Sequence, residues 1–92
     1  MKNLNVEFVW NSVTVKLYYE VPTATTDLNV QTAILTALSV YGGNTYLGLK
    51  HKIANDPTWN YSDAVPSNLT DTQISNAINS AIGIIGGRPR RP

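Results

Sequence analysis

The 92-residue sequence contains no cysteine, which excludes disulfides and thiolate metal sites. Histidine occurs once, at position 51, and a single imidazole without cysteine gives no basis for a zinc site. Charged residues form only 14% of the chain, well below the roughly 25% of an average domain. Asn, Thr and Ser supply the polar surface instead, a composition that suits a subunit packed within an assembly.

Long apolar runs are also missing. No apolar run approaches the roughly 18 residues of a membrane span, so we expect no membrane-spanning segment. The N-terminal residues 1–5 lack the charged segment and apolar core of a signal peptide. We therefore expect a cytoplasmic location or a place within a virion assembled there. The hydrophobic fraction of 42% and the length of 92 residues predict one folded domain.

Positive charge is concentrated at the C-terminal end. All three arginines, at positions 88, 90 and 91, follow Gly86–Gly87. The preceding residues hold four lysines and six acidic residues, a formal charge of 4 − 6 = −2, and the arginines add three. We expect a compact domain over residues 1–87 and a basic Arg/Pro arm over 88–92. The negative charge of the domain itself argues against a nucleic-acid platform.

The first segment alternates apolar and polar residues in two runs separated by Asn11–Ser12, which predicts a β-hairpin. If this loop closes directly, the numbers of opposing residues sum to 23. One face is then wholly apolar, and Glu7 faces Lys16 on the other, so register and charge agree. Asn-Ser is a weaker turn than Asn-Gly, because the second position requires a positive φ.

Two helices are expected. The first runs from about 27 to 41, with Thr26 or Asp27 as its N-cap and Gly42–Gly43 as its end. The second has a capping box in which Thr70 is the N-cap and Gln73 the N3 residue, and it ends at Gly86.

Loose alternation over residues 45–53 predicts a third strand, and residues 54–68 read as a loop. The predicted fold class is therefore α+β. The order is β-β-α-β-α, with an antiparallel hairpin and a third strand packed against two helices.

Residues 13–17, 20–23 and 27–30, followed by Gly42–Gly43, resemble the hairpin-then-helix half of ubiquitin-like β-grasp folds. The likeness covers residues 4–43 and implies a β-grasp-like fold as an alternative. Gly86–Gly87 is similar to the ubiquitin tail. There the pair follows a final strand, whereas here it follows a capped helix and precedes five residues, so conjugation would require processing.

The sequence offers little for catalysis. His51 lies between Lys50 and Lys52, which disfavour its charged form, and a structural role is expected for it. The carboxylates are scattered singly, and helix starts account for Asp27 and Asp71. Both glycine pairs follow helices, whereas a phosphate-binding loop precedes one. We expect no enzyme activity, no cofactor, no metal and no small-molecule substrate.

These features favour a structural or interaction protein, a small subunit of a larger assembly such as a minor virion protein of a phage or virus. One alternative is a small mobile-element inhibitor or adaptor that binds a host protein. Another is a weak nucleic-acid-binding module, since three arginines would give a salt slope near −2.7 on duplex DNA. In each case we expect a protein partner, self-assembly or a nucleic acid. The candidate partner-binding residues are Arg88, Arg90, Arg91, Lys16 and Tyr18.

Overall fold

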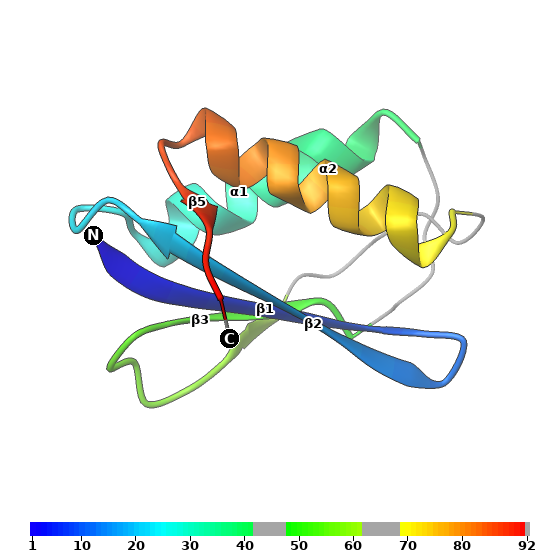
Figure 1. The fold of residues 1–92 in the computed structure, drawn as a ribbon, viewed down its shortest axis with the longest axis horizontal. Coiled ribbons are helices and arrows are strands. Elements are labelled where there is room, and N and C mark those ends of the chain that lie inside the picture. The colour runs from blue at the N-terminus through cyan, green and yellow to red at the C-terminus, as the bar shows by residue number, and fades with distance from the viewer. Residues whose placement is uncertain (42–47, 62–68, 92) are drawn as a thin grey trace.

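The computed structural model describes residues 1–41, 48–61 and 69–91 and has the predicted α+β class (Figure 1). The elements in chain order are β1 (Lys2–Trp10), β2 (Val13–Val21), α1 (Asp27–Ser39), β3 (Lys50–Ile53), β4 (Asn60–Tyr61), α2 (Asp71–Ile84) and β5 (Arg88–Pro89). The predicted β-β-α-β-α order is confirmed, and two short edge strands, β4 and β5, are added to it.

The hairpin has the predicted register. Trp10 pairs with Val13 and Glu7 with Lys16, so opposing residue numbers sum to 23 along the whole ladder. Asn11 and Ser12 have φ angles of 52° and 65°, the left-handed conformation that a two-residue hairpin turn requires. The apolar pattern and the turn therefore specify the same pairing.

The sheet contains five strands in the order β4-β3-β1-β2-β5, and every pairing is antiparallel. The strand expected over residues 45–53 is found at Lys50–Ile53, and residues 45–47 lie outside the described part of the chain. The hairpin occupies the centre because β3 pairs with β1 on one side and β5 pairs with β2 on the other.

Both helices lie on the same side of the sheet and run in opposite directions (Figure 1). The side chains between the two layers form the core, and each is at most 9% exposed. They are Leu4, Val6, Phe8, Tyr19, Val21, Val30, Ile34, Leu38, Leu49, Ile53, Ile74, Ala77, Ile78, Ala81 and Ile82. Alternation along β1 and helical periodicity along α2 thus meet in one apolar layer.

Two aromatic side chains connect the hairpin to the second helix and the residues before it. The indole Nε1 of Trp10 donates to the carbonyl oxygen of Leu69 at 2.9 Å. The hydroxyl of Tyr19 donates to Oδ1 of Asn79, and burial raises the pKa of this phenol. These bonds give the polar atoms of both rings a partner.

The predicted caps are present at both helix starts. The Thr70 side chain accepts from the backbone N–H of Gln73, whose own side chain accepts from the Thr70 N–H. The first helix starts in the same way at Thr26, which completes a capping box with Asn29. The N-cap of α1 is therefore Thr26, the first of the two predicted candidates.

The two helices end at Ser39 and Ile84. Helix α1 ends at Ser39, two residues before the predicted end at 41, and the Gly42–Gly43 cap lies outside the described residues. Gly86 ends the second helix, as predicted, with a φ of 88°. The N–H groups of Gly86 and Gly87 donate to the carbonyl oxygens of Gly83 and Ile82, the two bonds of a Schellman motif. Because this glycine pair caps a helix, the likeness to β-grasp folds does not extend to it.

Among the described residues, no helix is long and apolar enough to cross a membrane.

Candidate functional site

His51 is the one histidine, and the fold places it in the core against the start of α1. Its Nε2 lies 3.0 Å from Oδ1 of Asp27, and the residue is 2% exposed. Burial lowers the pKa of the His51 imidazole, while Asp27 and Asp56 oppose that shift. Lys50 and Lys52 predict the same direction from the sequence, but the main cause of the lowered pKa is burial.

The His51–Asp27 pair fastens β3 to α1. The sequence analysis gave Asp27 a role at the helix start only, since nothing in the chain spacing connects positions 27 and 51. Within the described ranges, no group of three or more His, Asp or Glu side chains is placed to hold a metal ion.

The C-terminal tail, predicted as a basic Arg/Pro arm over residues 88–92, begins with a strand along the edge of the sheet. Arg88 and Pro89 form strand β5 against Glu20 and Tyr19 of β2, and the N–H of Arg90 donates to the Tyr18 carbonyl oxygen. The edge of β2 has backbone groups free to pair, and the tail donates to it through the N–H of Arg90. Pro89 has no N–H and is tolerated because β5 is an edge strand.

Arg90 anchors this tail. Its Nη1 donates to the carbonyl oxygens of Leu4 (3.1 Å) and Tyr19 (2.8 Å), and its Nη2 donates to Oδ1 of Asn5 (2.8 Å). The guanidinium carbon also lies 5.4 Å from the centroid of the Tyr18 ring. The half-buried guanidinium thus spans β1 and β2 on the side of the sheet that faces away from the helices.

We call that side the open sheet face. The pairing register places Lys52, Asn5 and Tyr18 in one row across β3, β1 and β2, and Arg90 extends the row beyond β2. We call these four residues the central row. The neighbouring rows contain two ion pairs, Lys50 with Glu7 at 3.7 Å and Arg88 with Glu20 at 3.4 Å.

A polar pocket of about 190 Å³ lies beside the central row. It is lined by Asn3, Asn5, Lys52, Ala54, Asn55 and Arg90. Three amides and two cations are groups that bind anions and hydrogen-bonding ligands.

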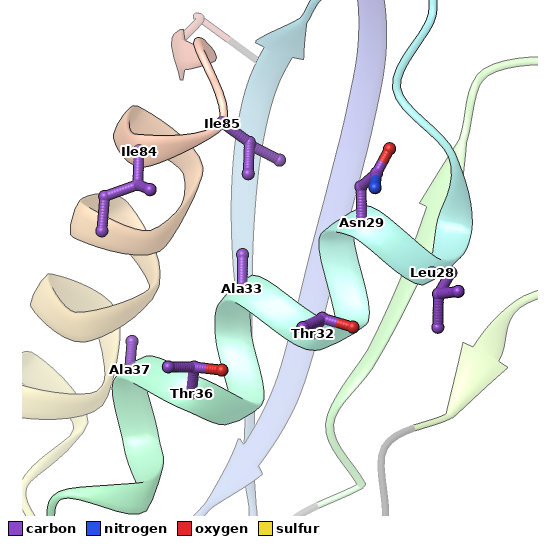
Figure 2. Close-up of a pocket in the computed structure, with 8 residues that line it drawn as sticks. All are labelled: Leu28, Asn29, Thr32, Ala33, Thr36, Ala37, Ile84 and Ile85. Atoms are coloured by element: carbon purple, nitrogen blue, oxygen red, sulfur yellow. The ribbon is translucent and has the colours of Figure 1, made fainter.

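On the opposite side of the molecule, an apolar groove of about 480 Å³ runs between the outer surfaces of the helices (Figure 2). Its α1 side runs from Leu28 to Ala37, and its α2 side consists of Ile84 and the following Ile85. Ala33 and Ala37 keep the groove open because they are small, and Leu28 and Ile84 flank it with side chains that are largely exposed.

Four of the five candidate partner-binding residues lie on the open sheet face: Lys16, Tyr18, Arg88 and Arg90. Arg91 is exposed but follows Arg90 outside the central row. Sequence reasoning missed Lys52 and Asn5 because their place depends on the long-range pairing of β3 with β1. It also missed the groove, whose apolar residues on α1 and α2 read as parts of ordinary amphipathic helices.

Comparison with known proteins found no family model, no curated protein and no solved structure that matches this chain.

Proposed function

We propose that the protein is a non-enzymatic structural subunit that assembles with further copies of itself through the outer face of its helical layer. The observation that carries this proposal is the apolar groove between α1 and α2, which lies on a helical surface almost without charge. We call this surface the helical face; it comprises the groove residues and the exposed residues around them on both helices.

The lack of charge on the helices supports a covered surface. The two helices comprise 13 and 14 residues, and their only charged residues are Asp27 and Asp71, each in a first turn. Exposed helix faces normally carry lysines and glutamates, which keep a monomer soluble. Interface cores are depleted of charge, so a neutral helical face fits a buried position in an assembly.

The shape of the helical face favours a second copy as its occupant. Leu28 and Ile84 are 69% and 82% exposed, whereas the alanines between them leave a recess. In a two-fold symmetric contact the same patch meets itself, so it must contain both projecting and recessed parts. The helical face contains both, and it has no charge that would repel an identical neighbour.

The pairing of His51 and of three carboxylates supports a role without catalysis. The imidazole is buried against Asp27, while Glu7 and Glu20 are paired with cations on the open sheet face. Each of these groups thus has a structural partner.

Light scattering coupled to size-exclusion chromatography tests the proposal on the full chain. We expect a mass that rises with concentration from the 10.1 kDa of the monomer to twice that value or more. Ile84→Lys places a charge in the helical face and should weaken association by at least about tenfold.

Val13→Lys is the matched control, since Val13 is also an exposed aliphatic residue (61%) but lies in the hairpin, away from the helical face. It should leave association unchanged. A monomer mass at every concentration, or equal weakening by the two lysine substitutions, contradicts the proposal.

A further inference from the structure

We infer that the open sheet face is a second binding site, independent of the helical face, and that it binds single-stranded nucleic acid. The inference rests on the charge of this face, on the neutral partners of Arg90 and on the aromatic and amide groups of the central row.

The open sheet face has an excess of positive charge. Folding collects five of the seven Lys and Arg residues on the open sheet face, together with two carboxylates. The cations are Lys16, Lys50, Lys52, Arg88 and Arg90, and the carboxylates are Glu7 and Glu20. Among the described residues the face therefore has a charge of 5 − 2 = +3, whereas the formal charge of the whole sequence is only +1. A face with this excess of cations attracts a polyanion.

The guanidinium of Arg90 is held by neutral groups. The three side-chain hydrogen bonds of its guanidinium go to two backbone carbonyls and one amide oxygen, all of them neutral. In the described part of the chain, no carboxylate lies within 4.0 Å of it. A half-buried cation held by neutral groups keeps its full charge, and a bound anion would compensate it. Lys52, at the other end of the central row, lines the same pocket as Arg90.

The groups between these cations favour a nucleic acid as the polyanion. Between the two cations of the central row lie Asn5 and Tyr18, and the guanidinium carbon of Arg90 lies 5.4 Å from the centroid of the Tyr18 ring. Nucleobases stack on aromatic rings and on guanidinium planes, and their edges pair with amides. An acidic peptide or an anionic membrane would satisfy the cations, but its carboxylates or phosphates offer no aromatic group to stack on the Tyr18 ring. A single strand offers phosphates, planar bases and hydrogen-bonding edges together.

An open sheet also has the right shape for such a ligand. Its side chains stand in rows across the strands, and the bases of a single strand are free to spread over them. In the described residues both helices lie on the other side of the sheet, so the strand and a second copy of the protein would occupy opposite sides (Figure 1).

Fluorescence anisotropy with a labelled oligothymidine, titrated with the full-length protein at several salt concentrations, tests the inference. At low salt we expect a Kd of about 1–100 µM. Three cations, Lys16, Lys52 and Arg90, have no carboxylate within ion-pair distance among the described residues, which predicts a slope of log K against log salt of about −0.7 × 3, or −2.

Two pairs of variants separate the site from general charge. Lys52→Ala should lower the salt slope by about 0.7, whereas Lys2→Ala, which removes a cation on the helix side of the sheet, should not. Tyr18→Leu should weaken binding at least about fivefold at every salt concentration, and Tyr18→Phe, which keeps the ring, should bind like the parent. Circular dichroism confirms that each variant is folded.

The inference is overturned if the protein shows no salt-dependent binding of the oligonucleotide, or if Lys52→Ala and Lys2→Ala change the salt slope equally. It is also overturned if inorganic polyphosphate or phosphatidylserine vesicles bind as well as the oligonucleotide while Tyr18→Leu has no effect. Ile84→Lys distinguishes this site from the proposed assembly, since the monomeric variant should still bind the oligonucleotide through its open sheet face.

Discussion

The guanidinium of Arg90 donates to the carbonyl oxygen of Leu4 at 3.1 Å, across 86 positions of the chain. The same Nη1 atom donates to the carbonyl oxygen of Tyr19, the residue that pairs with Leu4 across the hairpin. The last residues of the chain thus clamp the two central strands, and the basic tail is part of the fold as well as of the positive surface.

Arg90→Ala should lower the free energy of unfolding by about 1–3 kcal/mol, because the carbonyl oxygens of Leu4 and Tyr19 lose a charged donor. Urea unfolding followed by circular dichroism measures this change. Arg91→Ala is the matched control, since the described part of the chain offers that exposed side chain no partner. The control should change stability by less than about 0.5 kcal/mol. Equal losses of unfolding free energy in the two variants would show that the hydrogen bonds of Arg90 contribute nothing to stability.

The hairpin and the helix starts were predictable because their determinants are local. Alternation and the Glu7–Lys16 pair specify the register of β1 and β2, and a slip of one residue would turn the apolar face to solvent. Likewise, the capping box from Thr70 to Gln73 lies within four consecutive residues and needs no tertiary partner.

The tail and the central row were not predictable in the same way. Arg88–Pro89 has no alternation and becomes a strand only because the edge of β2 is free to pair with it. Alternation separates Lys52 from His51 on β3, but only the pairing of β3 with β1 places Lys52 beside Asn5. The net charge of the sequence, +1, therefore gives no indication that five cations gather on one face of the sheet.

Replacing Gly83 and Gly87, two glycines near the end of α2, by alanine should change the stability of the protein in opposite directions. At Gly83, within α2, an added Cβ meets nothing within 4 Å, so Gly83→Ala should stabilise the protein by about 0.5–1 kcal/mol through helix propensity. At Gly87 the Cβ would lie 2.8 Å from the Glu20 carbonyl oxygen and against Ile82, so Gly87→Ala should destabilise it by about 1–3 kcal/mol. Thermal unfolding of the two variants measures both signs. A neutral Gly87→Ala would mean that β5 does not approach β2 this closely in solution.

The stability of the protein should depend on pH through His51. Burial lowers the pKa of its imidazole below the ordinary value of 6.5, so between these two values the unfolded chain binds more protons than the folded protein. The contribution of His51 is therefore fully present above about pH 6.5 and is lost progressively as the pH falls below it, by at most about 1.4 kcal/mol per pH unit. Urea unfolding at about pH 7.5 and 5.5 measures the difference, and His51→Gln, which cannot titrate, should show a smaller one.

Nuclear magnetic resonance can follow the same group directly, because the chain contains a single histidine. The imidazole signals of His51 should titrate below pH 6.5. Asp27→Asn removes the carboxylate that opposes the effect of burial, so it should lower the pKa of His51 further while an amide oxygen still accepts from Nε2. Asp71→Asn, at the start of the other helix, removes the same charge and should leave the titration unchanged. A His51 that titrates at or above 6.5 would mean that Asp27 and Asp56 outweigh the effect of burial.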